Sequence, residues 1–205
     1  MLINLKVKDF IQEVASDSPA PGGGSVAALS CSLGASLLSM QANLTVGKKG
    51  YEAVEDKMKE VAMIAKSAAD KFLKTIDDDT KAFDAFFEAM KMPKDTDEQK
   101  AARSAAMQGA AKGATLVPLQ LAIDAASLID MAKYCIENGN KNATSDGAVA
   151  LTMLRSGILG AIYNVRINLG SIKDTEFVEK TAAKVDKIEK TTKEKEEEIL
   201  SKVQL

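Results

Sequence analysis

The sequence has no histidine and no tryptophan, and among its 205 residues only 2 are cysteine and 4 are proline. Without histidine, the chain cannot form a Ser–His–Asp or Cys–His catalytic pair, nor the histidine-containing sites of most zinc enzymes. Proton transfer near neutral pH must therefore use a carboxylate, lysine, cysteine, tyrosine or water. Such a group needs a pKa that burial or a neighbouring charge has displaced.

A strong net charge and long apolar runs are also missing. The formal net charge is -2, which is not the basic footprint of a nucleic-acid-binding protein. No uninterrupted apolar run reaches the roughly 18 residues of a membrane span, and the first ten residues lack the apolar core of a signal peptide. We therefore expect a cytoplasmic protein with no nucleic-acid or membrane partner. Cys31 and Cys135 are then expected to be reduced thiols, although the sequence alone also permits a disulfide between them.

Helical spacing of apolar residues dominates what is present, and hydrophobic residues make up 46% of the chain. Residues 25–45 are small or apolar around the whole helix, which is typical of a buried helix. Pro118 is expected to interrupt the fourth helical stretch. With no strand pattern, the sequence predicts a single all-α domain over residues 1–205, an antiparallel bundle of five to seven helices. The helical stretches are 7–16, 25–45, 52–91, 97–138, 146–170 and 174–203.

A glycine-rich turn, Pro21-Gly22-Gly23-Gly24-Ser25, precedes the helix predicted over 25–45. Glycines before a helix N-terminus let backbone N–H groups approach a ligand, and the helix dipole favours an anion there. No Gly-Lys-Ser/Thr follows, so the turn is not a nucleotide P-loop. The pattern alone leaves open a plain tight turn that enters a helix.

Three adjacent carboxylates, Asp77, Asp78 and Asp79, lie on the amphipathic stretch 52–91. Neighbouring residues on a helix point about 100° apart, so at least one of them should approach the apolar side. A partly buried aspartate has a raised pKa and can exchange protons near neutral pH. The alternative is a solvated helix face or a helix cap.

Polar residues are scattered through otherwise apolar helices. Asn164 and Asn168 are four residues apart and share a helix face. Lys48 follows the end of the predicted helix 25–45, where a cation is favoured anyway, but it could also meet a ligand carboxylate. Buried polar groups need partners, which either a polar ligand or interhelix hydrogen bonds can provide. The scattered residues are Asn43, Arg103, Gln108, Asn140, Asp146, Arg155, Asn164, Arg166 and Asn168.

Taken in order, these elements resemble the cyclodeaminase/cyclohydrolase family of folate enzymes. That family includes the C-terminal domain of formiminotransferase-cyclodeaminase and stand-alone methenyltetrahydrofolate cyclohydrolases. The ordered set, which covers essentially the whole chain, is specific, whereas no single motif is. The matching elements are Pro21-Gly-Gly-Gly-Ser25-Val26, Met40, Ala42-Asn43-Leu44-Thr45, Gly47-Lys48-Lys49, Asp77-x-Asp79, Ala82-Phe83, Met92-Pro93-Lys94, Arg103, Gln108, Val117-Pro118-Leu119, Gly139-Asn140, Ser145-Asp146, Gly160-Ala161, Asn164-Val165 and Ile167-Asn168-Leu169.

The resemblance implies a homodimer with a folate site in a cleft at or near the subunit interface. It implies tetrahydrofolate derivatives as partners, with or without a polyglutamate tail, and no metal or other cofactor. The family's acid/base carboxylate maps to Asp79, with Asp77 as a nearby second acid. The expected folate-binding residues are Gly22, Gly23, Gly24, Ser25, Asn43, Lys48, Arg103, Asn140, Asp146, Asn164 and Asn168.

The resemblance implies a formiminotetrahydrofolate cyclodeaminase, which converts 5-formiminotetrahydrofolate to 5,10-methenyltetrahydrofolate and ammonia. One alternative is a methenyltetrahydrofolate cyclohydrolase, which converts the 5,10-methenyl form to 10-formyltetrahydrofolate. An alternative of another class is a non-catalytic, folate-binding helical assembly protein. One departure is Gln41, where a small aliphatic residue is expected. Its amide could face the pocket or lie on the helix surface.

Overall fold

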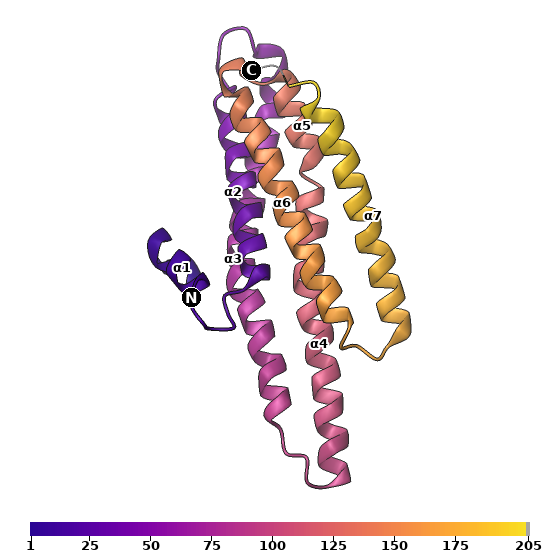
Figure 1. Cartoon of the computed structure of the whole chain (residues 1–205). Helices are drawn as coiled ribbons and strands as arrows, with labels where there is room; N and C mark the ends of the chain where they lie inside the picture. The colour runs from indigo at the N-terminus through magenta and orange to yellow at the C-terminus, as the bar shows by residue number, and fades with distance from the viewer. Residues whose placement is uncertain (204–205) are drawn as a thin grey trace.

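The computed structural model describes residues 1–203, and its long helices pack lengthwise in alternating directions (Figure 1). These residues contain no strand, so the prediction of an all-α bundle of five to seven helices is confirmed. Three short 3-10 helices complete the structure: η1 (Leu2–Asn4), η2 (Glu52–Val54) and η3 (Lys141–Ala143). The α-helices are α1 (Val7–Val14), α2 (Gly23–Asn43), α3 (Glu55–Lys91), α4 (Asp97–Ala126), α5 (Ile129–Asn138), α6 (Thr144–Leu169) and α7 (Thr175–Leu200).

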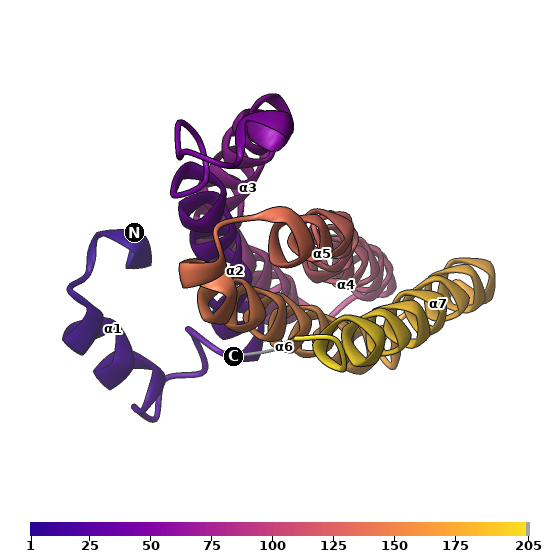
Figure 2. The same cartoon turned by 90° about the horizontal axis from the view of Figure 1, so that it is seen from above.

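Helix α2 packs against both α3 and α6 (Figure 2). Glycines allow the helix backbones to approach closely. A Cβ at Gly34 would lie 2.8 Å from the Ala150 carbonyl oxygen. A Cβ at Gly157 would lie 2.3 Å from the Cys31 sulfur. The small residues of α2 and α6 therefore serve close helix packing.

Pro118 does not interrupt α4, contrary to the sequence-based expectation. The helix continues to Ala126, and the break falls at Ser127 and Leu128, before α5. A proline has no N–H to donate to the carbonyl four residues earlier, here that of Ala114. The Asn168 side-chain nitrogen donates to that carbonyl at 2.9 Å. A side chain from α6 thus replaces the missing helical donor.

Gln41 lies in the core, neither in a pocket nor on the helix surface. Its side chain is fully buried, and its amide nitrogen donates to the Cys135 carbonyl at 3.1 Å. A Cβ at Gly147 would lie 2.3 Å from the Gln41 amide oxygen. The longer side chain at position 41 therefore fits because position 147 has none.

Both cysteines are free and buried, which confirms the expectation of reduced thiols. Burial raises the pKa of Cys31 and of Cys135 to about 12. A thiol with such a pKa stays protonated near neutral pH and is a poor nucleophile.

Three helical stretches are long and apolar enough to cross a membrane by length and composition: Gly23–Asn43, Asp97–Asn138 and Lys141–Leu169. The sequence has no long uninterrupted apolar run because small and uncharged polar residues separate the apolar ones. Helices that are long and apolar enough to cross a membrane are nevertheless present. Between 44% and 56% of each apolar window is buried in the bundle.

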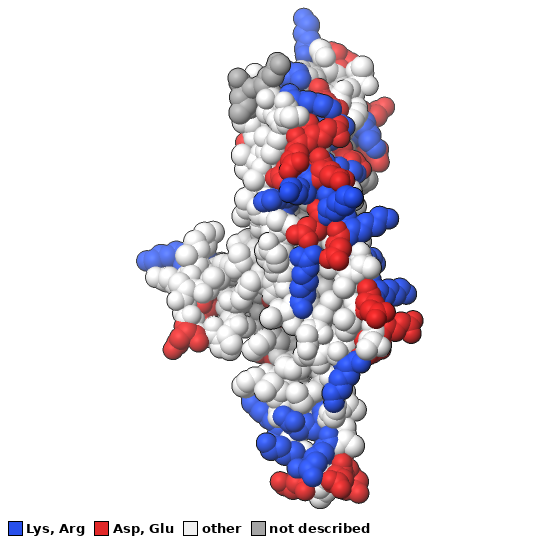
Figure 3. Space-filling model, turned by 45° about the vertical axis from the view of Figure 1, so that its right-hand side comes forward, with Lys and Arg blue, Asp and Glu red and all other residues white. Residues whose placement is uncertain are grey.

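The exposed part of α2 and α6 forms an uncharged surface, which we call the α2/α6 face. It contains the exposed apolar residues Val26, Leu33, Met40, Leu44, Val149, Tyr163 and Ile167. The two arginines of α6 instead pair with α7, Arg155 with Glu196 and Arg166 with Asp186 and Glu189. Figure 3 shows charged side chains gathered on the α7 side, with an uncharged surface beside them.

Candidate active site

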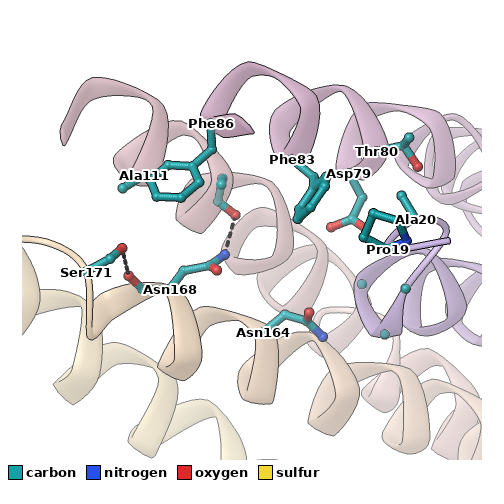
Figure 4. Close-up of a pocket in the computed structure, with 14 residues that line it drawn as sticks. Pro19, Ala20, Asp79, Thr80, Phe83, Phe86, Ala111, Asn164, Asn168 and Ser171 are labelled. Atoms are coloured by element: carbon teal, nitrogen blue, oxygen red, sulfur yellow. Dashed lines mark hydrogen bonds between the residues drawn. The ribbon is translucent and has the colours of Figure 1, made fainter. Parts of the chain in front are cut away.

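A pocket of about 300 Å³ lies where the start of α2 meets α3, α4 and α6 (Figure 4). Its walls combine a glycine-rich turn, a carboxylate, two aromatic rings and two side-chain amides. The lining residues are Pro19, Ala20, Gly22, Gly23, Gly24, Asp79, Thr80, Phe83, Phe86, Ala111, Ala114, Asn164, Asn168 and Ser171.

The Asp79 carboxylate is held against the N-terminal turn of α2. The Ser25 hydroxyl lies 3.0 Å from Asp79 Oδ2 and donates a hydrogen bond to it. Burial raises the pKa of Asp79, while hydrogen bonds from the side chain and backbone of Ser25 lower it in part. The protonated form of Asp79 is thus more accessible near neutral pH than that of an exposed aspartate, as proton transfer requires.

The glycine-rich turn is needed for this approach. A Cβ at Gly24 would lie 2.1 Å from Asp79 Oδ1, so a side chain at position 24 would displace the carboxylate. The N-terminus of a helix favours an anion. The group that lies at the N-terminus of α2 is the chain's own Asp79 carboxylate, whereas the sequence-based expectation was a ligand anion there.

Asn164 and Asn168 face the pocket from α6, across from the aromatic rings of α3 (Figure 4). Asn164 donates to the Gly160 carbonyl at 2.8 Å, and Asn168 donates to the Ala114 carbonyl. These bonds fix the two amide groups in orientation. The pocket can therefore bind a flat, partly apolar ring that also carries hydrogen-bonding groups at its edges.

Asp77 does not line this pocket. Its side chain is 5% exposed, and its Oδ1 accepts a hydrogen bond from the Leu2 backbone N–H at 2.6 Å. Because it is two residues from Asp79, it points about 200° away from it around the helix. The structure thus places the two carboxylates on different sides of α3.

Four other predicted residues lie beyond the opposite end of α2. Lys48 Nζ donates to Asn140 Oδ1 at 2.8 Å, and the Asn140 amide nitrogen donates to the Leu44 carbonyl at 3.1 Å. Asn43 ends α2, and Asp146 lies in the first turn of α6 near this cluster. Within one chain, these residues are therefore not brought into the pocket that holds Asp79.

Arg103 lies in a third place, at the hairpin between α3 and α4. Its Nε donates to the Met90 carbonyl at 3.0 Å. A single chain thus gathers Gly22, Gly23, Gly24, Asn164 and Asn168 around Asp79, with Ser25 behind the carboxylate, but it does not gather Arg103.

Phe83 belongs to the ordered motifs, but neither Phe83 nor Phe86 is among the predicted site residues. Phe83 and Phe86 line the pocket beside Asp79. They follow Asp79 by four and seven residues, the spacing that places side chains on one helix face. The same periodicity that predicted the helix could therefore have joined them to Asp79.

Comparison with known proteins identifies relatives over nearly the whole chain. The formiminotransferase-cyclodeaminase family model matches residues 6–187. The methenyltetrahydrofolate cyclohydrolase of Methylorubrum extorquens is 42% identical over 176 residues, which cover 86% of this chain and 85% of that protein. The formimidoyltransferase-cyclodeaminase of Sus scrofa is 39% identical over 176 residues, which cover 86% of this chain but 32% of that longer protein.

A solved structure has the same fold. The crystal structure of formiminotetrahydrofolate cyclodeaminase from Thermotoga maritima superposes with a TM-score of 0.80 at 28% identity, over 98% of this chain and 100% of that one. The apolar helices of the bundle are therefore part of a fold that this formiminotetrahydrofolate cyclodeaminase shares. The chain belongs to the formiminotransferase-cyclodeaminase family of folate enzymes, as the ordered motifs of its sequence predict.

Proposed function

We propose that this protein is a formiminotetrahydrofolate cyclodeaminase in the cytoplasm, with Asp79 as the residue that transfers protons. The observation that carries the proposal is the buried Asp79 carboxyl, which Ser25 holds in a pocket walled by aromatic rings and amides. The rings of Phe83 and Phe86 suit the flat ring system of a folate, and the amides of Asn164 and Asn168 suit its polar edges. The similarity to the Sus scrofa formimidoyltransferase-cyclodeaminase and to the Thermotoga maritima formiminotetrahydrofolate cyclodeaminase supports this substrate class.

The proposed reaction begins when the side-arm nitrogen N10 of 5-formiminotetrahydrofolate attacks the carbon of the formimino group in its protonated, amidinium form. A C–N bond forms, and the Asp79 carboxylate takes the proton from N10. Protonated Asp79 then gives this proton to the amino group on the tetrahedral carbon, the C–N bond to ammonia breaks, and the methenyl cation remains. General acid–base catalysis of this kind typically contributes about 10²–10⁴-fold. The negative charge of Asp79 also stabilises the cationic product.

Ser25 can support both protonation states of Asp79. When Asp79 is ionised, the Ser25 hydroxyl donates to it at 3.0 Å. When Asp79 is protonated, it can donate to Ser25 Oγ, while the serine proton turns to the Ile76 carbonyl, which lies 3.1 Å away. A hydroxyl is both donor and acceptor, so this contact persists through the proton transfer. Only the folate substrate and this chain's own residues take part in these steps.

The second candidate reaction is that of a methenyltetrahydrofolate cyclohydrolase. The 42% identity with the Methylorubrum protein, over most of both chains, favours it. Water would attack the methenyl carbon, and Asp79 would take the water proton. Asp79 would then return the proton to N5 as the N5–C bond breaks, and the remaining hydroxyl proton would pass to solvent as the carbonyl forms, which leaves 10-formyltetrahydrofolate. One carboxylate can serve both reactions, because each passes through a tetrahedral carbon between N5 and N10.

We also propose a homodimer, formed by antiparallel pairing of the α2/α6 faces. In a two-fold pair, the same surface of each copy meets the other. Because the pocket and the Lys48–Asn140 cluster lie at opposite ends of α2, antiparallel pairing would bring the cluster of one copy toward the pocket of the other. Lys48 would then meet the glutamate carboxylates of the folate. This arrangement accounts for predicted site residues that one chain keeps apart.

The test is spectroscopic. Purified protein is mixed with 5-formiminotetrahydrofolate, and in a second assay with 5,10-methenyltetrahydrofolate, while the methenyl absorbance is followed. A rise in the first assay supports the cyclodeaminase, and a faster fall in the second than without protein supports the cyclohydrolase. Asp79→Asn should remove the activity, whereas Asp84→Asn, an exposed change on the same helix, should not. Binding of both folates without turnover would instead identify a non-catalytic folate-binding protein.

A further inference from the structure

Asp77 is a buried carboxylate that the proposed chemistry does not use. It is the one charged residue that is buried among residues 1–203. It belongs to the same turn of α3 as Asp79 but does not line the folate pocket. Burying a charge is costly unless it is paired or hydrogen-bonded, so this position calls for an explanation other than proton transfer to the substrate.

The partner of Asp77 is the beginning of the chain. Asp77 Oδ1 accepts the Leu2 backbone N–H at 2.6 Å, while Oδ2 has no hydrogen-bond partner in the described structure. The side chains of Leu2 and Ile3 pack against the core beside this contact. The amino-terminal end of the chain is thus fastened to α3 by one charge-assisted hydrogen bond and a small apolar contact.

The other end of the same segment forms one wall of the pocket. After α1 the chain returns to the bundle, where Pro19, Ala20 and Gly22 line the pocket. Gly24 and Ser25 then contact Asp79. Residues 1–22, which we call the N-terminal strap, therefore run from the contact with Asp77 to the start of α2, where Gly24 and Ser25 meet Asp79 on the same turn of α3.

The middle of the N-terminal strap is held weakly. Helix α1 stands apart from the bundle in both views (Figures 1 and 2). Phe10 is its only buried residue, whereas Val7 and Ile11 are 78% and 60% exposed. The position of the pocket wall at Pro19 to Gly22 thus depends mainly on the two fastened ends.

We propose that Asp77 is a positioning residue: its bond to the Leu2 N–H fixes the N-terminal strap and thereby the Pro19–Gly22 wall of the folate pocket. This inference rests on the proposed function, because it treats that pocket as the substrate site. It assigns Asp77 a role different from that of a second proton-transfer acid. An amide at position 77 can still accept from Leu2 through its oxygen, whereas an alanine cannot.

The experiment compares Asp77→Asn and Asp77→Ala in the full chain, with Asp78→Ala as the control at the adjacent, half-buried carboxylate, which pairs with Lys81. Hydrogen exchange of residues 1–22 is measured without substrate, and kcat and KM are measured separately. Asp77→Ala should raise exchange in the strap about tenfold or more, the effect of losing one hydrogen bond to a charged group. It should also raise KM several-fold and change kcat less. Asp77→Asn and Asp78→Ala should leave the exchange rate of the strap, KM and kcat within about twofold of the wild-type values.

Two results would overturn the proposal. One is that Asp77→Asn abolishes turnover as Asp79→Asn does, with unchanged exchange in the strap, because Asp77 would then transfer protons. The other is that Asp77→Ala leaves exchange in the strap and KM unchanged, or raises exchange equally through the whole bundle. If Asp77→Ala does not fold, deletion of residues 1–4 removes the Leu2 donor and makes the same comparison. The exchange measurement needs no substrate, so it stands even if the wild-type protein shows no folate turnover.

Discussion

Asn168 supplies the hydrogen bond that Pro118 cannot make. The proline leaves the Ala114 carbonyl without its helical N–H donor, and the Asn168 side chain from α6 donates to that oxygen at 2.9 Å. Ala114 and Asn168 both line the pocket. One side chain thus keeps α4 continuous and helps to shape the candidate active site.

Replacing Asn168 should therefore cost stability, and the cost should depend on Pro118. Asn168→Ala removes the donor to a partly buried carbonyl, so the free energy of unfolding should fall by about 0.5–1.5 kcal/mol, the net value of one hydrogen bond. In a Pro118→Ala background the alanine N–H can serve the Ala114 carbonyl, and the same change should cost clearly less. Urea denaturation of both single variants and the double variant measures this coupling. Additive losses would show that Asn168 does not compensate for the proline.

Asp79 should oppose stability at neutral pH while it supports activity. Because its folded-state pKa is raised, its protonated form stabilises the fold at low pH, and this contribution is lost as pH rises through the raised pKa. Asp79→Asn should therefore be at least as stable as the wild type at pH 7, yet lose about 10²–10⁴-fold in kcat. Thermal melts at several pH values, together with the methenyl absorbance assay, test both parts. Near-normal turnover in a folded Asp79→Asn variant would remove Asp79 from the mechanism.

The pH profile should also respond to Ser25. Its hydrogen bonds lower the pKa of Asp79 in part, so Ser25→Ala should raise that pKa further. If ionised Asp79 takes the first proton, the acidic limb of kcat/KM should move to higher pH in this variant. Ser36→Ala, which removes a hydroxyl that bonds only to the Ser32 carbonyl of the same helix, is the control and should leave the limb in place. An unmoved limb in Ser25→Ala would mean that another group controls it.

The glycines before α2 should differ in their tolerance of a side chain. Gly24→Ala would place a Cβ 2.1 Å from Asp79 Oδ1 and displace the carboxylate, whereas a Cβ at Gly22 would meet only the Pro19 carbonyl, at 3.6 Å. A displacement of about 1 Å in a reacting group can cost about 10²-fold in rate. Gly24→Ala should therefore lose about that much activity, and Gly22→Ala should keep most of it. Equal losses in the two variants would argue against the contact with Asp79 as the reason for the glycine.

The sequence predicts the helices, the small-residue packing and the partial burial of one aspartate among residues 77–79, because these follow from local periodicity, while the catalytic role of Asp79 stays a prediction. It does not predict features that depend on a partner far along the chain. Pro118 is compatible with α4 only because of Asn168, and Gln41 fits the core only because Gly147 has no side chain. Asp77 likewise turns away from Asp79 toward Leu2, 75 residues earlier. In each case, a residue that local sequence preferences disfavour is accommodated by a residue far along the chain.

Lys48 and Asp79 lie near opposite ends of α2 within one chain. If two copies pair through their α2/α6 faces, each active site should use Asp79 from one copy and Lys48 from the other. Co-expressed Asp79→Asn and Lys48→Ala chains would then form hybrid dimers in which one site carries both defects and the other carries neither. With random pairing, about one quarter of all sites should be intact, so the mixture should regain about one quarter of wild-type activity. Lys48→Ala alone should mainly raise KM for folates, so the mixture is assayed at low substrate concentration.

Activity no higher than the mean of the two parent variants would place Lys48 and Asp79 in separate functions or in the same chain. The variant Leu33→Glu puts a charge on the α2/α6 face. It should elute as a monomer in gel filtration and should show little activity in the methenyl absorbance assay.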